Sequence, residues 1–551
     1  MRAGLNVFCV GLLLLVASGG ASGQTAPPAA PQVTTGADLK RLIFDWDPVP
    51  GATYYQLLVR TWPTRPFEVL RDDIEAPKTR VAQPIASHLI YWEYVRYMVA
   101  ACNAAGCTNS DEIAVQDQLL DTIGYFKASN TEAGDLFGQD VALSADGQTL
   151  AVTARREASS ATGADGDQAA NDSSGSGAVY VYRRNGAHWQ QEAYLKAGEN
   201  QAEQLFGTGE PAETRALSIS RDGSVIAVGA GHQDVSGIVD AGAVYIYERS
   251  STGSWNLGAT LQAPRTRAND FFGAALELSL NGRTLKVSSS GPRDGEGNAE
   301  GRSHIFVHRA AGWRHSTTIA PFYAGDHCAV TRMSADGETL VQYCGDFSGG
   351  TQRIVTLKRS ADEWVHASDL PITVGFTLRQ PLALNADATQ MAIQQPYYAE
   401  REVRIYRWFE GSGWSLETNF LPPSNSPYVA SFGASLAFSG DGTLLAIGEP
   451  RGPYSGAGGL YPAFLDETGE QQQGIVHLLL REEDNPERWS QISWIKAPNP
   501  GNGDAFGNSV ALNGNGRVLA VGAPEEDGAA TGVDGDREDD SAPDAGAVYL
   551  Y

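Results

Sequence analysis

Two acidic segments of the sequence have the residue types and the spacing of a cation site. The first runs from Ala161 to Asn171 and the second from Ala530 to Asp540, and they match without a gap at an offset of 369 residues. Both keep the pattern Asp-x-Asp-x-x-x-Asn/Asp, which presents oxygen donors of the kind that calcium binds. We therefore predict a cation site, with calcium as the ion, from six donors: Asp165, Asp167, Asn171, Asp534, Asp536 and Asp540.

Solvated surface loops are the alternative interpretation of these segments, because charged loops also keep a protein soluble. Asp234 and Asp240 lie in the corresponding segment of a third copy of the pattern. With or without a metal ion, the segments predict one strongly acidic sector on the folded chain.

Catalytic motifs are absent from the sequence. Gly-x-Ser-x-Gly, His-Glu-x-x-His, the Walker loop, Gly-x-Gly-x-x-Gly and Cys-x-x-Cys do not occur. The nine histidines are scattered, and none recurs at the spacing of metal ligands, which favours ordinary surface or core histidines. An active site would therefore need residues from distant parts of the chain that meet in one pocket.

Four cysteines follow the N-terminal region, and their even number favours two disulfides in an exported protein. Cys328 and Cys344 flank a hairpin that turns at residues 335–337, which would place the two thiols opposite each other. Cys102 and Cys107 flank a short loop in the same way. Four free thiols are the alternative.

The N-terminal residues and the net charge limit where the protein acts. Residues 1–23 combine an early Arg2, an apolar run and a small-residue end, the pattern of a secretory signal peptide. No later apolar run reaches the roughly 18 residues of a membrane span. The net charge of −25 repels nucleic acid and anionic lipid. We expect a secreted or cell-surface protein that binds neither nucleic acid nor membrane.

A small domain follows the Pro/Ala linker at residues 24–31. Residues 32–115 alternate apolar and polar positions in short runs, as half-buried strands do. The segments 43–59 and 97–106 resemble strands of a fibronectin type III domain, with Trp46 in the core and Tyr97 at the tyrosine corner. The resemblance implies a small β-sandwich that serves as a spacer or binding unit.

One unit recurs from Tyr125 onward, and each copy contains four strand-like runs. A copy begins with a run that ends in Lys-Ala or Gln-Ala, continues with Phe-Gly and an Asp-Gly or Asn-Gly turn, and ends with a strand marked by Trp. The third run reads Gly-Ala-Val-Tyr-x-Tyr at residues 177–182, 242–247 and 546–551. Four strands per unit indicate the blade of a β-propeller.

Seven such units fit into residues 124–551, so the sequence predicts an all-β chain with a seven-bladed β-propeller after the sandwich. The seventh unit ends at its third strand, Tyr551. The Trp that marks the fourth strand stands eight residues before the Ala of Lys-Ala, and eight before Ala128 is Leu120. Residues 116–123 are therefore expected to close the ring as the missing strand, within a propeller that spans 116–551.

The Phe-Gly pair followed by Val-Gly-Ala-Pro at residues 521–524 resembles the FG-GAP repeat of the integrin alpha-subunit propeller. The resemblance extends over residues 124–551 and is weak in the fourth and fifth units, about 319–418. It implies calcium loops between the first and second strands, but residues 143–147 and 512–516 hold too few oxygen donors and match plain hairpin turns. It also implies a ligand-binding face formed by the loops between strands two and three and those from strand four to the next strand one.

These observations favour a non-enzymatic binding or adhesion protein that engages an extracellular protein or glycan through one propeller face. An extracellular hydrolase or lyase with an active site at the propeller axis is the second hypothesis. A structural component of a surface layer or matrix is the third. The sequence itself identifies no ligand.

Overall fold

The computed structural model describes residues 26–186, 188–209, 215–289, 301–323, 326–345, 352–361, 363–372, 381–397, 400–422, 431–452, 472–482, 484–485 and 488–551. The expected signal peptide, residues 1–23, lies outside these ranges. The chain divides into two compact units. One comprises Met1–Thr35, Ile43–Ala82 and Tyr94–Val115, and the other comprises Gly36–Leu42, Gln83–Glu93 and Gln116–Tyr551.

Helices are few and short in the described residues. They are the 3-10 helices η1(Ser87–Leu89), η2(Trp92–Tyr94), η3(Gln116–Gln118) and η4(Leu120–Thr122). No helix of the described chain has the length and apolarity that a membrane crossing requires. The rest of the regular structure is β-strand.

Two sheets form in the N-terminal part of the chain, before residue 110. A three-stranded sheet has the order β1-β2-β5 and a four-stranded antiparallel sheet the order β4-β3-β6-β7. Trp46 is buried and packs against Tyr55 with ring centroids 5.1 Å apart, as expected of a core residue. The strands are β1(Val33–Asp38), β2(Arg41–Trp46), β3(Tyr54–Arg60), β4(Glu68–Glu75), β5(Arg80–Pro84), β6(Arg96–Asn103) and β7(Gly106–Asn109).

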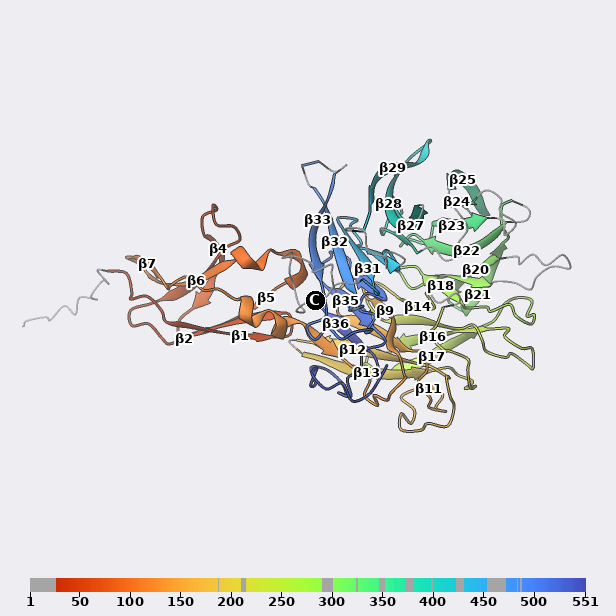
Figure 1. Ribbon diagram of the computed structural model, residues 1–551, viewed down its shortest axis with the longest axis horizontal. Helices are drawn as coiled ribbons and strands as arrows, with labels where there is room; N and C mark the ends of the chain where they lie inside the picture. Colours follow the sequence, from red (N-terminus) through yellow and green to blue (C-terminus); the bar gives the residue numbers. More distant parts are fainter. Residues whose placement is uncertain are drawn as a thin grey trace, which may run out of the picture. The chain divides into compact units, whose positions relative to one another are not determined.

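Seven further sheets follow, and each holds four consecutive antiparallel strands in chain order, apart from the last (Figure 1). The first sheet carries an extra short strand, β11(Gly163–Ala164), on its outer edge. The first four sheets are β9(Phe137–Leu143), β10(Thr149–Ala154), β12(Ala178–Asn185), β13(His188–Lys196); β14(Leu217–Ile219), β15(Val225–Ala230), β16(Ala243–Arg249), β17(Trp255–Leu261); β18(Ala275–Leu278), β19(Thr284–Ser289), β20(Arg302–Arg309), β21(Gly312–Ile319); and β22(His327–Met333), β23(Thr339–Gly345), β24(Gln352–Ser360), β25(Glu363–Ile372).

The last three sheets complete the series. They are β26(Leu382–Leu384), β27(Gln390–Tyr397), β28(Glu400–Phe409), β29(Gly413–Phe420); β30(Ser435–Phe438), β31(Leu444–Glu449), β32(Ile475–Arg481), β33(Trp489–Ile495); and β34(Ser509–Leu512), β35(Leu519–Ala523), β36(Ala547–Leu550) with β8(Gly124–Phe126). The fourth and fifth sheets are complete although their sequences lack Phe-Gly, so that pair is not required for a sheet to form.

The turn between the first and second strands is built in the same way in all seven sheets. A Ser or Asn side-chain oxygen accepts the N–H of the residue five positions later at 2.9–3.0 Å. Two positions after that Ser or Asn, an Asp or Asn accepts a second N–H, as Asp146 does from Gln148. Residues 143–147 and 512–516 are therefore hairpin turns, as interpreted from the sequence.

Backbone hydrogen bonds join these seven turns into a cycle. The bonds run Asp146 N to Arg221 O, Arg221 N to Leu280 O, Leu280 N to Ala335 O, Ala335 N to Ala386 O, Ala386 N to Gly440 O, Asp441 N to Gly514 O and Gly514 N to Ala145 O, at 2.7–3.4 Å. The first strands of neighbouring sheets also contact one another, and β34 of the last sheet contacts β9 of the first. Sheets arranged around one axis in this way form a β-propeller.

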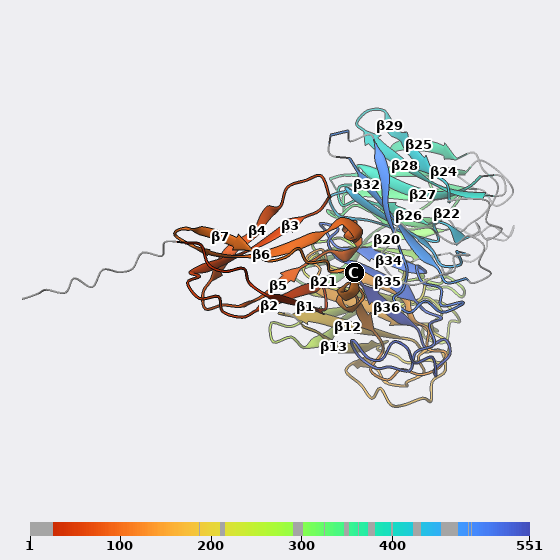
Figure 2. The same cartoon turned by 60° about the vertical axis from the view of Figure 1, so that its left-hand side comes forward.

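The chain closes this cycle with a strand from its N-terminal side. Strand β8 pairs antiparallel with β36, with Tyr125 opposite Tyr549. The blue strands of the last sheet lie beside gold β12 of the first in both views (Figures 1 and 2). The expected closing segment, residues 116–123, was placed a few residues too early: it holds η3 and η4 instead. The extrapolation failed because the last copy has no Trp strand of full length, and β8 holds only three residues.

Apolar clusters fill the space between neighbouring sheets. In the first of them, Phe137 of the Phe-Gly pair packs against Tyr180 and Tyr182 of its own sheet and shares a cluster with Val548 and Leu550 of the last sheet. Gly138 has φ +93°, and a Cβ there would lie 2.5 Å from the Ala547 oxygen. Glycine therefore allows the two backbones to approach.

Candidate functional site

The two acidic segments form equivalent loops on neighbouring sheets. One connects β10 to β12 and the other connects β35 to β36. Asp165 accepts the backbone N–H of Tyr194 at 3.0 Å, and its own N–H donates to the Tyr194 oxygen at 2.7 Å. Asp534 makes the same two bonds with Tyr125, at 3.1 and 2.7 Å. Both Asp residues have φ +55°. Because each makes two hydrogen bonds with a Tyr of the outer strand, it fixes its loop to that strand.

The other expected donors are spread along these loops. Asp167 accepts the N–H of Ala169 at 3.0 Å, and Asp536 accepts the N–H of Glu538 at 3.0 Å. The Asn171 amide donates to Glu132. Burial and the charges of Glu526 and Asp527 raise the pKa of Asp540. The contacts of Asp167 and Asp536 stay within one loop each, whereas Asn171 reaches Glu132 in the segment before β9.

The six residues are not gathered into one ligand set. In the part of the chain that the structure describes, no group of three or more His, Cys, Asp or Glu side chains is placed to hold a metal ion. The reason is that Asp165 and Asp534 point their oxygens at backbone N–H groups of the outer strands. The sequence therefore identified the matching loops but not the contacts of their carboxylates.

Beneath each loop lies a buried Lys–Glu–Tyr cluster that sequence reasoning missed. Lys196 pairs with Glu157 at 2.7 Å, and the Tyr194 hydroxyl donates to the same carboxylate at 2.6 Å. Lys127 and Tyr125 make the equivalent contacts with Glu526, at 2.7 and 2.8 Å. Burial lowers the pKa of both lysines, and the Glu partners oppose that effect. The recurrent Lys-Ala of the repeat was the available signal.

Two buried carboxyls accompany these clusters. Burial and the charge of Glu157 raise the pKa of Asp135 to about 7. Burial raises the pKa of Asp504 to about 7 in the same way, with Glu526 adding to it. Each precedes a Phe-Gly pair by two residues and accepts a backbone N–H, from Glu132 and Gly501 respectively.

A series of cavities follows the propeller axis. The first has a volume of about 40 Å³ and lies towards the same end of the sheets as the acidic loops, because β9 runs from Phe137 near that end to the turn at the other. The second shares Arg215, Arg332 and Leu436 with it. The third, about 570 Å³, lies beside the cycle of turns. We call the first the axial cavity.

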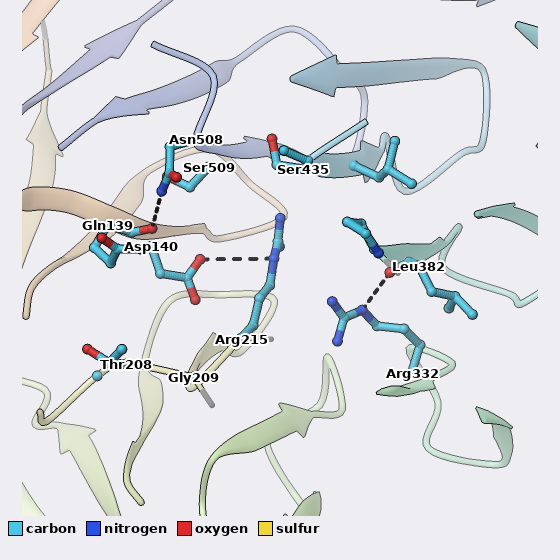
Figure 3. A pocket seen from close by; sticks show the side chains of 14 residues that line it. Gln139, Asp140, Thr208, Gly209, Arg215, Arg332, Leu382, Ser435, Asn508 and Ser509 are labelled. Atoms are coloured by element: carbon cyan, nitrogen blue, oxygen red, sulfur yellow. Dashed lines mark hydrogen bonds and ion pairs between the residues drawn. The ribbon is translucent and has the colours of Figure 1, made fainter. Parts of the chain in front are cut away.

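Four charged side chains line the axial cavity and the second cavity, where the equivalent positions of other sheets hold mainly Ala or Ser. Asp140 comes from β9, Arg215 precedes β14, Glu277 lies on β18 and Arg332 on β22. Figure 3 shows Asp140, Arg215 and Arg332 around the axial cavity. No His, Cys or Lys side chain is among the described residues that line this cavity.

Burial dominates the electrostatics of this group. It raises the pKa of Asp140 to about 6, with Arg215 opposing, and it raises the pKa of Glu277, with Arg332 opposing. Lys286, on the neighbouring strand β19, has its pKa lowered to about 7 by burial and by the charge of Arg332. One usable signal was present in the sequence, namely charged residues at inner-strand positions where other repeats hold small ones.

The expected disulfides are confirmed. Cys102 is bonded to Cys107 and Cys328 to Cys344. Cys328 and Cys344 stand opposite each other on β22 and β23, as the hairpin in the sequence predicted.

Comparison with known proteins gives one sequence match. The model of the FG-GAP repeat family matches residues 489–551, which include β33 to β36. No curated protein matches the chain. Among solved structures, the chain is similar to the β-propeller domain of Myceliophteria thermophila Cps50 (Swd1), at 11% identity and TM-score 0.45, covering 77% of this chain and 97% of that one.

Two further structures are similar at the same level. One is the periplasmic gluconolactonase PpgL of Pseudomonas aeruginosa, at 12% identity and TM-score 0.41, covering 81% of this chain and 97% of that one. The other is a putative 6-phosphogluconolactonase from Bacteroides uniformis, at 8% identity and TM-score 0.39, covering 81% and 98%. The matched residues and the cycle of four-stranded sheets together identify a β-propeller that contains an FG-GAP repeat.

Proposed function

We propose that this chain is a secreted or cell-surface, non-enzymatic binding protein that engages an extracellular protein or glycan through the loops between strands two and three. The observation that carries the proposal is the pair of equivalent acidic loops, each fixed by an Asp to the outer strand of its sheet. Loops held by a rigid frame are the usual site of recognition.

Two architectural proposals accompany it. The seven four-stranded sheets are the blades of one seven-bladed propeller, supported by the cycle of backbone hydrogen bonds. Residues 32–115 are a fibronectin type III-like domain, supported by the sheet orders β1-β2-β5 and β4-β3-β6-β7. The small domain serves as a spacer or an added binding unit.

The partner is expected to carry positive charge. Asp167, Asp536, Glu538 and Asp540 are exposed on the two loops. An exposed ion pair contributes about 0.2–1 kcal/mol, so four of them contribute about 0.8–4 kcal/mol, which is at least about fourfold in affinity. A lysine-rich protein surface and a glycan with free amino groups both meet this requirement.

The test uses two cationic probes, oligolysine and chitosan oligosaccharide, with N-acetylated chitin oligosaccharide as the uncharged counterpart. The variant D167N/D536N/E538Q/D540N removes the exposed charges and leaves Asp165 and Asp534 in place. We expect at least about fourfold weaker binding of the cationic probe at low salt. Surface plasmon resonance of the full chain measures it.

The matched control is E363Q/E410Q, which removes exposed acids from two other sheets. Equal loss in both variants would mean non-specific attraction and would contradict the proposal. Calcium assistance, expected from the sequence, is tested in the same assay with calcium added or chelated. Stronger binding with calcium that the loop variant lacks would support a calcium-assisted face.

An extracellular hydrolase or lyase with an axial active site is the second candidate. The observation that favours it is Asp140 Oδ2, which is buried and has no hydrogen-bond partner in the described structure. A carboxyl with a pKa of about 6 beside Arg215 is suited to proton transfer. Hydrolysis of lactone or ester substrates that disappears in D140N would favour the enzyme. A surface-layer component, the third candidate, predicts that loop variants leave every partner interaction intact.

A further inference from the structure

Two guanidinium groups lie beside the axial cavity, and their acidic partners are at the limit of ion-pair distance. Arg215 Nε is 4.0 Å from Asp140 Oδ1, and Arg332 Nε is 4.0 Å from Glu277 Oε2. In Figure 3 the Arg215 side chain lies between the Asp140 carboxylate and Arg332. Charge-assisted hydrogen bonds are ordinarily about 2.7–2.9 Å long. These pairs therefore attract each other without closing.

Several other buried or half-buried pairs of the same chain are closed. Lys196 and Glu157 are 2.7 Å apart. Arg249 binds Glu192 with two parallel bonds of 2.8 and 2.5 Å. Arg481 and Glu417, at 3.9 Å, form another open pair, but Arg215, Asp140, Arg332 and Glu277 are open pairs whose side chains line the cavities of the axis.

Each of the two arginines uses only some of its N–H groups in hydrogen bonds to the protein. Arg215 Nη2 donates to the Val510 oxygen at 2.6 Å. Arg332 donates from Nε to the Leu382 oxygen at 2.8 Å and from Nη1 to the Thr331 oxygen at 3.5 Å. A guanidinium has five N–H donors. None of the remaining nitrogens of these two arginines is buried without a partner in the described structure, and both residues line the cavity.

Two further polar atoms of the cavity lining make no hydrogen bond to the described residues. Asp140 Oδ2 and Thr208 Oγ1 are buried and have no hydrogen-bond partner among the described residues. A buried polar atom without a partner is costly. The Thr208 hydroxyl is an O–H donor at every pH, and Asp140 becomes one when it is protonated. The cavity then offers hydroxyl, carboxyl and guanidinium donors together.

We propose that the axial cavity binds a single oxyanion group, a carboxylate, sulfate or phosphate, between Arg215 and Arg332, and that protonation of Asp140 opens the site. The ligated anion replaces the Asp140 charge as the partner of Arg215. Thr208 and protonated Asp140 donate to its oxygens. This site is separate from the loop face and does not depend on the function proposed for that face.

The charges around Asp140 set the direction of the pH dependence. The groups that face it are Arg215 and Arg332, and Arg332 in turn faces Glu277 and Lys286. With a pKa of about 6, Asp140 becomes neutral as the pH falls, and Lys286, with a pKa of about 7, becomes charged. Both changes make the cavity more positive. Anion affinity therefore rises as the pH falls through this range.

The experiment titrates the full chain with inorganic sulfate, whose charge is constant between about pH 5 and pH 8, using isothermal titration calorimetry. We expect at least about tenfold tighter binding at the lower pH. Asp140→Asn keeps the acceptor for the Val141 N–H and removes the competing charge. This variant should bind sulfate at the higher pH more tightly than the native chain does at the same pH.

Arg215→Gln should lose at least about tenfold in affinity, with its unfolding temperature measured to show that it folds. Arg221→Gln is the matched control, because Arg221 is exposed and lines the third cavity, beside the cycle of turns. Glucose 6-sulfate in place of sulfate identifies the source: tighter binding of the sugar indicates an oxyanion carried by a larger molecule, and tighter binding of sulfate indicates a free anion. Both results support the site.

Two results would overturn the proposal. One is sulfate affinity that is equal at both pH values and unchanged in Arg215→Gln, which would mean an adventitious ion only. The other is absence of binding in both the native chain and Asp140→Asn. The Asp140→Asn variant keeps the test decisive even if Arg215→Gln fails to fold.

Discussion

The phenol of Tyr551 donates a 2.5 Å hydrogen bond to the backbone oxygen of Lys496, which lies at the end of the neighbouring sheet. Tyr182 makes the same bond to Lys127 at 2.5 Å, and Tyr247 makes it to Lys196. The bond thus recurs wherever a sheet with Tyr-x-Tyr follows a run that ends in Lys-Ala. It ties each third strand to the previous sheet.

Replacing Tyr182 with Phe should lower the free energy of unfolding by about 1–2 kcal/mol, because the buried Lys127 carbonyl loses its donor. Chemical denaturation of the full chain measures the change. Tyr91→Phe is the control, since Tyr91 is exposed. Equal effects of the two substitutions would argue against the inter-sheet bond.

Replacing Phe126 with Ala should be more damaging, at about 3–5 kcal/mol. Phe126 lies on the closing strand β8, is fully buried and packs edge-on against Tyr182 and Trp189 of the first sheet. Phe322→Ala is the comparison, because 54% of that side chain is exposed. If Phe126→Ala melted like the native chain, β8 would not be the strand that closes the propeller.

Stability should fall as the pH rises through the range where Asp135 and Asp504 titrate. Their folded-state pKa of about 7 lies above the ordinary 3.8, so between these values the folded chain binds protons that the unfolded chain lacks. A pKa raised from 3.8 to about 7 corresponds to on the order of 4 kcal/mol. Unfolding temperatures measured from about pH 5 to pH 8 test the direction.

The variant Asp135→Asn tests whether Asp135 is a source of this pH dependence of stability. Asn keeps the acceptor for the Glu132 N–H and cannot ionise, so the variant should be more stable than the native chain at high pH and equal to it at low pH. The next repeat already holds the neutral and buried Gln204 at this position. A variant with the same pH slope as the native chain would exclude Asp135 as the source.

The two disulfides should contribute unequally. Cys328–Cys344 closes a loop with a sequence separation of 16 and Cys102–Cys107 one of 5. In the chain-entropy model these loops correspond to about 3 and about 2 kcal/mol. Replacing each pair by Ser and measuring unfolding of the whole chain tests the ranking. A larger loss from the shorter loop would show that packing, rather than loop closure, sets their contribution.

Much of the fold follows from the sequence because its repeat is local. The Ser-x-Asp-Gly turns and the alternation in the strands depend on neighbouring residues, and the described chain after Tyr125 is β-strand in four-stranded sheets, as the repeat indicated. The closing strand was misplaced because β8 carries no motif beyond Tyr-Phe-Lys-Ala. Its position depends on pairing with β36, more than 400 residues away in the chain.

The candidate sites were harder to predict for the same reason. Asp165 and Asp534 match in sequence, but the direction of their carboxylates depends on outer strands that the pattern does not reveal. Asp140, Arg215, Glu277 and Arg332 lie on four different sheets. Only the closed arrangement brings them together, so the sequence showed charged residues at inner-strand positions but not that they meet in one place.

The seven backbone hydrogen bonds around the axis all run in one rotational sense, each N–H donating to the carbonyl of the following sheet. Peptide dipoles arranged head to tail in a circle cancel along the axis, unlike those of a helix, which add. The cycle of turns at this end of the axis therefore contributes almost no field of its own. The potential that an ion meets inside is set by a handful of side chains, and a single substitution there can reverse its sign without altering the scaffold.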